Sequence, residues 1–223
     1  MIDLQSKLVV VTGAAGALGV AVVAAFEALG ANVVGLDIVE RSGIIPCDLF
    51  DSASCSAAVS RVREEHGAID VLVNVAGGFA MGEAVHETSA ATWQLMHDLN
   101  AGSVLNMARA VVPGMLEAGA GKIVNIAARA GLHGAANMGA YVASKSVVIR
   151  LTETLSEELR EQGINVNCVL PSIIDTPANR EAMPEEDFSR WVAPASLAGV
   201  IAFLASNMAA DIHGAALPVE GLS

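Results

Sequence analysis

The chain has 223 residues, of which 53% are hydrophobic and 16% are charged, and its formal net charge at pH 7 is -12. This length is enough for one domain with a full core, and the apolar content indicates extensive burial. Binding to nucleic acids or anionic membranes needs clusters of lysine and arginine, so the acidic charge and the lack of a basic run argue against both and leave a small-molecule function open.

Cysteines and histidines show no metal-binding or disulfide pattern. Cys47, Cys55 and Cys168 are odd in number and follow no C-x-x-C spacing, and the five histidines are scattered, so we expect no zinc site or other metal site. The uncharged stretch Leu8–Phe26 is interrupted by glycines and is not read as a membrane span, and no signal peptide is expected before it. These features predict a cytoplasmic protein.

Short apolar runs alternate with longer segments of helical period along the whole chain. The predicted strands are Leu8–Val11, Asn32–Leu36, Ile44–Cys47, Val71–Val73, Lys122–Ile126, Ile164–Val169 and Ala215–Val219. The predicted helices include Leu18–Leu29, Ser52–Glu65, Thr92–Ala118 and Ala140–Gln162. This alternation predicts an α/β fold with a doubly wound, seven-stranded, mostly parallel sheet and helices on both faces. Residues 175–194 are expected to form an irregular, mobile substrate loop at the carboxyl edge of the sheet.

The first predicted strand runs into a glycine-rich turn, Thr12-Gly13-Ala14-Ala15-Gly16-Ala17-Leu18-Gly19. Gly13 permits a sharp exit from the strand, Gly16 lets the backbone approach a pyrophosphate, and Gly19 lets the helix pack closely on the strand. Free N–H groups in the first helical turn, at Ala17 and Leu18, would face the anion. An ordinary strand-to-helix turn is the alternative interpretation.

Asp37 ends the next predicted strand, where a carboxylate can accept hydrogen bonds from both hydroxyls of an adenosine ribose. The 2′-phosphate of NADP would instead need a cation. Ala14, Ala15 and Ile38 supply none, and the charge of Asp37 would repel the phosphate. The sequence therefore predicts NAD as the cofactor, unless Asp37 merely caps the element that follows.

These motifs, in their order and spacing, resemble the short-chain dehydrogenase/reductase family over essentially the whole chain. The matching motifs are Thr12–Gly19, Asp48-Leu49, Asn74-Val75-Ala76-Gly77, Asn100, Tyr141-x-x-x-Lys145 and Pro171-Ser172, where Ser172 replaces the family's glycine. The resemblance implies a Rossmann-type fold, one NAD(P)-binding domain over residues 1–223, and a homodimer or homotetramer. It also implies cofactor contacts by Ile38, Asp48, Leu49, Asn74, Ala76, Gly77, Pro171, Ile174 and Thr176.

Tyr141, the only tyrosine in the chain, lies one helical turn before Lys145 and on the same face. The ammonium group can therefore favour the phenolate, whose pKa must fall from near 10 by roughly 2–3 to be useful at neutral pH, a shift that the lysine and the positive nicotinamide of NAD⁺ could supply together. The resemblance implies that Tyr141 is the general acid/base and that Lys145 tunes it and binds the nicotinamide ribose. Asn100 would hold a water that feeds protons to Lys145. A packing tyrosine and a solvated lysine are the alternative.

Ala128 departs from the family pattern, in which a serine donates a hydrogen bond to the reacting carbonyl oxygen. Losing one such donor typically costs about 2.7–4 kcal/mol in the transition state. Arg129 is a poor replacement, because neighbouring side chains at a strand end usually point apart. Within the family, the dihydropteridine reductases have alanine at this place, and segments 77–82 and 175–191 also resemble them. Their quinonoid substrate accepts hydride in a conjugated ring, so one carbonyl oxygen matters less.

The sequence thus predicts an NAD(H)-dependent oxidoreductase that transfers hydride between nicotinamide and a small conjugated acceptor, possibly quinonoid dihydropteridine. A general ketone/alcohol dehydrogenase of the same family is one alternative, and a catalytically weak NAD(H)-binding sensor or scaffold is another. A reductase of acyl-carrier-protein substrates is disfavoured by Asp37, Ala128 and the acidic charge. Phe79, Met138, Met183 and Trp191 are candidate apolar walls of a substrate pocket, with packing in the core or at an interface as the alternative for each.

Overall fold

Seven parallel strands form one sheet in the computed structural model, which describes residues 2–223. The strands are β1 (Leu8–Thr12), β2 (Asn32–Asp37), β3 (Ile44–Pro46), β4 (Val71–Asn74), β5 (Gly121–Ile126), β6 (Ile164–Pro171) and β7 (Ala216–Val219). Their order is β3-β2-β1-β4-β5-β6-β7, and every neighbouring pair is parallel. The predicted doubly wound sheet is therefore confirmed, and it is parallel throughout.

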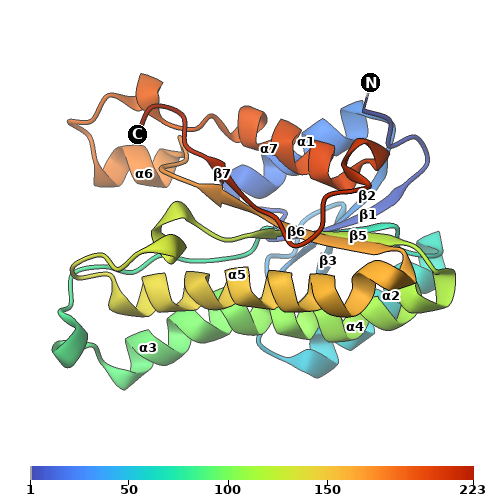
Figure 1. The fold of residues 1–223 in the computed structure, drawn as a ribbon, viewed down its shortest axis with the longest axis horizontal. Helices are drawn as coiled ribbons and strands as arrows, with labels where there is room; N and C mark the ends of the chain where they lie inside the picture. The colour runs from blue at the N-terminus through green and yellow to red at the C-terminus, as the bar shows by residue number, and fades with distance from the viewer. Residues whose placement is uncertain (1) are drawn as a thin grey trace.

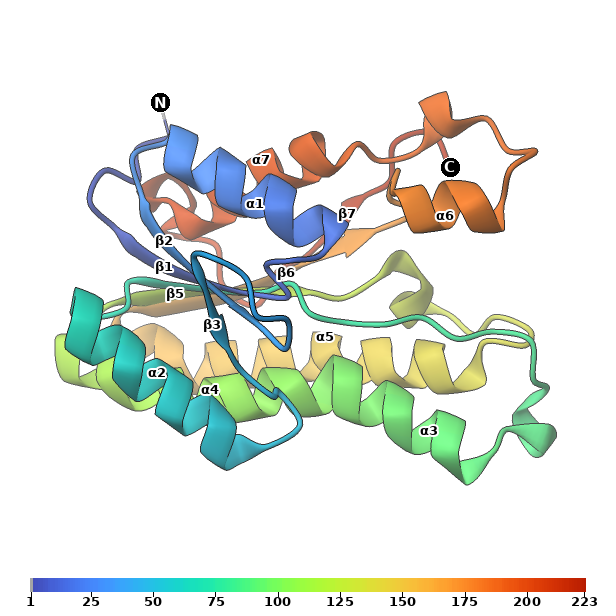
Figure 2. The same ribbon diagram turned by 180° about the vertical axis from the view of Figure 1, so that it is seen from behind.

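Helices cover both faces of the sheet (Figure 1), and Figure 2 shows the same two layers from behind. One layer holds α1 (Ala17–Ala28) and α7 (Pro194–Ala205), and the other holds α2 (Ser52–His66), α4 (Ser103–Ala118) and α5 (Gly139–Leu159). Helix α3 (Ala90–His97) extends the layer of α4, and the short α6 (Pro177–Ala182) lies close to the C-terminal end of the chain. Parallel strands need such crossovers, which bury both faces of the sheet.

The core consists of two layers because successive side chains of a strand point to opposite faces. In β1, Val9 and Val11 pack with Phe26 of α1 on one face. Val10 packs with Met107 of α4 on the other. All five side chains are fully buried, so β1 is an interior strand packed on both faces.

Three helical features differ from the prediction. The expected helix Thr92–Ala118 is divided by a π-helical turn, Asp98–Gly102, between α3 and α4. Residues 175–194 are not irregular, since they contain α6 and the 3-10 turn Phe188–Arg190. Helix α7 was not predicted, although Pro194 at its first turn is a usual start signal.

In the strand order, β2 and β4 lie on either side of β1. The chain segments that leave the carboxyl ends of these neighbouring strands therefore run in opposite directions along the sheet. In open parallel sheets the crevice at the carboxyl ends of such strands is where ligands bind. The glycine turn follows β1, and Asp37 ends β2. Among residues 2–223, no helix is long and apolar enough to cross a membrane.

Candidate active site

The glycine turn after β1 has the shape of a phosphate cradle. Gly13 has φ +64°, and a Cβ there would lie 2.9 Å from the backbone N and Cα of Ala76. A Cβ on Gly19 would overlap the carbonyl of Gly13, so the start of α1 packs directly on the turn. Gly16 is exposed and caps α1 with no side-chain hydrogen bond. The first N–H groups of α1, which include Ala17, are thus available to an anion.

Asp37 lies directly beside this turn. Its Oδ2 accepts a hydrogen bond from the N–H of Ala15 at 2.9 Å, and its Oδ1 accepts one from Val39 at 3.3 Å. The next residue, Ile38, is 74% exposed. A fixed carboxylate next to a phosphate cradle and an open apolar residue fits the adenosine half of a dinucleotide.

The remaining predicted residues of this half lie on the following loops. Cys47 donates its N–H to the carbonyl of Asp37 at 2.8 Å, which brings Asp48 and Leu49 to the same edge of the sheet. Asp48 is exposed and Leu49 is buried.

The segment after β4 is fastened to β1 and to β5. Thr12 Oγ1 accepts hydrogen bonds from the N–H groups of Val75 at 3.1 Å and Ala76 at 3.2 Å. Asn74 is buried, and its Nδ2 donates to Asn125 Oδ1 at 2.8 Å. Its Oδ1 has no hydrogen-bond partner among the described residues. The side chain of Asn74 therefore binds within the sheet, beneath the surface where a cofactor would lie.

Gly77 is the point where the predicted catalytic residues meet. A Cβ on Gly77 would lie 2.9 Å from Asn100 Oδ1 and 3.1 Å from Lys145 Nζ. Lys145 is 5% exposed, and its Nζ donates to the carbonyl of Ile126 at 2.9 Å. Tyr141 lies one turn earlier on the same helix, α5. Residues from β4, the π-turn, β5 and α5 thus converge at one edge.

Asn100 holds this arrangement through all its side-chain polar atoms. Its Oδ1 accepts from the N–H of Gly78 at 2.9 Å, and its Nδ2 donates to the Gly78 carbonyl at 3.1 Å and to Ser144 Oγ at 2.9 Å. The side chain is 1% exposed. It therefore binds the loop after β4 to α5.

Burial dominates the protonation of the catalytic pair. Desolvation raises the pKa of Tyr141 to about 12. Desolvation also lowers the pKa of Lys145 to about 8, because a buried ammonium loses its hydration. The predicted lowering of the phenol pKa relied on Lys145 together with a bound, positively charged nicotinamide. Among the protein groups alone, the ammonium of Lys145 binds a main-chain carbonyl, and the cost of burying a phenolate prevails.

Ala128, which replaces the family's serine, is 4% exposed, so its methyl group is buried. Arg129, the adjacent residue, points elsewhere: its Nη1 donates to the carbonyl of Ser223 at 2.7 Å. This engagement agrees with our doubt that Arg129 replaces the missing serine donor.

The predicted nicotinamide side is formed by the end of β6 and the segment after it. Pro171 is buried at the end of the strand, and Ile174 forms a parallel bridge with Val192. Thr176 Oγ1 accepts from the N–H of Asn179 at 3.3 Å and so caps α6, while Asn179 Nδ2 donates to the Ile174 carbonyl at 2.7 Å.

The substrate loop is organised by side-chain contacts. Arg180 Nη2 donates to Asp175 Oδ2 at 2.8 Å, which holds the pKa of that carboxyl below its usual range, and its guanidinium lies 4.8 Å from the Phe188 ring centroid. Phe188 also contacts Trp191, with 4.8 Å between the centroids, and Trp191 is only 6% exposed. Trp191 is therefore a packing residue of this loop and not a pocket wall.

Phe79 is the aromatic side chain that reaches the site. Its ring meets Tyr141 edge to face, with centroids 4.9 Å apart, while Phe79 itself is 57% exposed. Beside it lies an open cavity of about 140 Å³, and its lining includes Met138, Glu83, Thr92 and Asn137. The prediction named Met138 but missed the polar lining, because scattered single residues carry no sequence motif. Among residues 2–223, no cluster of three or more His, Cys, Asp or Glu side chains could hold a metal ion.

Comparison with known proteins agrees with this geometry. A family model described as short chain dehydrogenase matches residues 7–187. D-threitol dehydrogenase of Mycolicibacterium smegmatis is 33% identical over 98% of this chain and 93% of its own. The 3-oxoacyl-acyl-carrier-protein reductase of Thermotoga maritima is 31% identical over 98% of each chain. The ligand-free structure of Thermoplasma acidophilum aldohexose dehydrogenase superposes with a TM-score of 0.91 at 31% identity, covering 99% of this chain and 95% of that one.

The chain belongs to the short-chain dehydrogenase family. The predicted Rossmann-type fold is confirmed by this solved structure, and the relatives, named as dehydrogenases and reductases, identify an oxidoreductase that uses a nicotinamide cofactor, NAD or NADP.

Proposed function

We propose that this protein is an NAD(H)-dependent oxidoreductase in which Tyr141 transfers the proton and Lys145 and Asn100 organise the site. One observation carries the proposal: Asn100 and Lys145 converge on Gly77, at the same sheet edge as the glycine turn, with Tyr141 one helical turn away. The whole chain is proposed to act as one dinucleotide-binding domain, with residues 175–194 on the substrate side.

The preference for NAD rests on Asp37. Its carboxylate is fixed beside the cradle by the N–H groups of Ala15 and Val39. This position suits the two ribose hydroxyls as donors and would place a 2′-phosphate against a negative charge. Bound nicotinamide would supply or accept the hydride.

The proton step is assigned to the phenol of Tyr141. With a pKa raised to about 12, the group is protonated at neutral pH and can donate to the reduced acceptor. Lys145 is buried one turn away on the same face of α5. Its ammonium charge balances the negative charge that forms when the phenol loses its proton. Phe79 packs edge to face with the Tyr141 ring and covers one side of it.

The acceptor is proposed to be small and conjugated, with a quinonoid dihydropteridine as the sharpest version. The methyl group of Ala128 gives no hydrogen bond to a reacting oxygen, and Arg129 binds the C-terminal segment. An acceptor that delocalises the developing charge in its own ring depends less on such a donor.

A general ketone/alcohol dehydrogenase is the second candidate. It is favoured by the relatives named above, whose names specify a polyol and a 3-oxoacyl group. A catalytically weak sensor that only binds NAD(H) is the remaining alternative and is favoured by Ala128 alone.

The protein is further proposed to be cytoplasmic and to form homo-oligomers. Exposed apolar side chains lie on the helical layer of α3, α4 and α5: Trp93 (47%), Leu95 (48%), Leu105 (38%), Leu116 (44%) and Val147 (37%). Burial of this layer between subunits would support a homodimer or homotetramer.

The experiment is NADH oxidation measured with a quinonoid dihydropterin beside a panel of ketones, polyols and quinones, with NADH and NADPH affinities titrated separately. We expect turnover of the dihydropterin, NADH preferred by at least about tenfold, and loss of activity in Tyr141→Phe. Turnover of polyols or ketones only would select the second candidate. Tight NADH binding with no turnover would select the sensor, and equal affinities for the two cofactors would refute the assignment to Asp37.

A further inference from the structure

The segment after β7, Glu220–Ser223, crosses the carboxyl edge of the sheet and is here named the C-terminal clasp. Ser172, which replaces a family glycine after β6, binds it twice. Its Oγ donates to the Glu220 carbonyl at 2.6 Å and lies 2.8 Å from Ser223 Oγ. Its N–H also donates to the Val219 carbonyl at 3.1 Å. The serine hydroxyl thus attaches the clasp to the end of β6.

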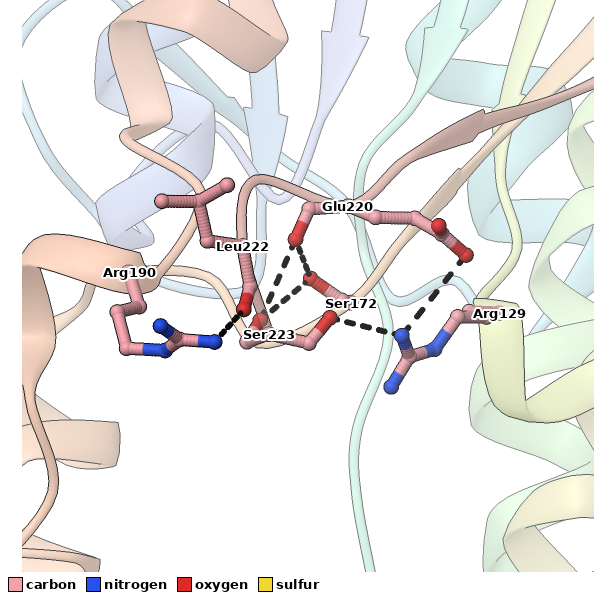
Figure 3. Close-up of polar contacts among 6 residues, drawn as sticks. All are labelled: Arg129, Ser172, Arg190, Glu220, Leu222 and Ser223. Carbon is pink, nitrogen blue, oxygen red and sulfur yellow. Dashed lines mark hydrogen bonds and ion pairs between the residues drawn. The ribbon is translucent and has the colours of Figure 1, made fainter.

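Two arginines reach the clasp from opposite sides (Figure 3). Arg129, from the turn after β5, donates to the Ser223 carbonyl at 2.7 Å, and its Nη1 lies 3.8 Å from Glu220 Oε1. Arg190, at the end of the substrate loop, donates to the Leu222 carbonyl at 2.6 Å, while the N–H of Leu222 donates back to the Arg190 carbonyl at 2.8 Å. The charged donors and main-chain acceptors make these contacts stronger than the exposed Arg129–Glu220 ion pair.

Backbone geometry shows that the clasp is shaped to fit the substrate loop. Gly221 has φ +59°, and a Cβ there would lie 2.7 Å from the Arg190 carbonyl. Only glycine combines this conformation with this approach. The close contact is therefore built into the sequence of the clasp and does not depend on side-chain rotamers.

We propose that the C-terminal clasp is a positioning element that fixes residues 175–191 of the proposed substrate loop against the ends of β5 and β6. Ser172 and Arg129 are its positioning residues. Both residues lie beside the site. Their polar side-chain groups form hydrogen bonds with the clasp and not with the substrate. The clasp joins three segments that are far apart in the chain, and Arg190 is the point where it holds the loop. The inference rests on the proposed placement of substrate beside this loop.

The test compares Ser172→Gly and Arg129→Met with two controls. Ser172→Thr keeps the hydroxyl, and Arg61→Met removes an exposed arginine that pairs with Glu65 on α2, away from the clasp. The first readout is hydrogen–deuterium exchange of residues 175–191 in the protein without substrate. We expect exchange there to accelerate about tenfold in Ser172→Gly and Arg129→Met, equivalent to about 1.4 kcal/mol, and to match wild type in both controls.

The second readout is the kinetics with whichever acceptor the enzyme turns over. A positioning role predicts a raised KM at nearly unchanged kcat and unchanged NADH affinity in the two clasp variants, with Ser172→Thr restoring the wild-type KM. Unchanged exchange of residues 175–191 in the clasp variants, with faster exchange confined to residues 220–223, would overturn the inference. Since exchange is measured without substrate, this result is independent of whether the proposed activity is found.

Discussion

Replacement of Gly77 by alanine is the sharpest test of the site geometry. The new Cβ would lie 2.9 Å from Asn100 Oδ1 and 3.1 Å from Lys145 Nζ, closer than ordinary van der Waals contact. Neither group can swing away freely. Asn100 makes three hydrogen bonds, and Lys145 donates to the Ile126 carbonyl while 5% exposed.

Relief of this contact therefore strains or breaks at least one of these hydrogen bonds, each contributing about 1 kcal/mol. We expect Gly77→Ala to lower the free energy of unfolding by about 1–3 kcal/mol and to abolish most of the activity, because both displaced groups belong to the proposed catalytic site. Urea unfolding followed by circular dichroism measures the first effect, and NADH oxidation measures the second.

Gly199 supplies a matched control. It lies exposed in α7, where a Cβ would meet nothing within 4 Å. Gly199→Ala should raise the free energy of unfolding by about 0.5–1 kcal/mol through its better helix propensity and should leave activity unchanged. If Gly77→Ala were as stable and as active as Gly199→Ala, the convergence of Asn100 and Lys145 on Gly77 would be refuted.

Three further predictions concern charge and hydrogen bonding. Burial lowers the pKa of Lys145 from 10.5 to about 8, so the unfolded chain binds more protons between these values and the stability contributed by Lys145 rises with pH there. Relative to Lys145→Met, the wild type should gain about 3 kcal/mol of unfolding free energy from pH 8 to 10.5; parallel stability profiles would contradict this. Asp37→Ala should raise the NADPH-to-NADH affinity ratio at least about tenfold in fluorescence titrations, and an unchanged ratio would place cofactor selection elsewhere. Ala128→Ser should raise ketone reduction about 100-fold in kcat; no gain would show that the missing donor does not limit the acceptor range.

Local motifs were readable from the sequence because their geometry lies within a few residues. The turn from Gly13 to Gly19 joins one strand to one helix, and the spacing of Tyr141 and Lys145 is one turn of a single helix. Asp37 was found for the same reason, at the end of the next strand. Short apolar runs between segments of helical period predicted the strand positions and hence the parallel sheet.

Properties that depend on tertiary contacts were not readable. The direction in which the Tyr141 pKa shifts is set by burial, which raises it despite the nearby Lys145. Helix α7 carries apolar residues all round, so it lacked an amphipathic period. Helix α6 was not predicted because its segment is rich in charged residues and proline. Its start is set by the Thr176 cap. The hydrogen bonds of Ser172 to residues 220–223 join chain segments too distant for any spacing rule.

The structural hydrogen bonds of the Asn100 side chain change how a mutation there is to be interpreted. Its side-chain amide links the loop after β4 to α5 through hydrogen bonds with Gly78 and Ser144. Both N–H groups of that amide are donated to protein partners, and its Oδ1 accepts one hydrogen bond, from Gly78. Loss of activity in Asn100→Ala would therefore report the lost link between this loop and α5 as well as any lost proton relay.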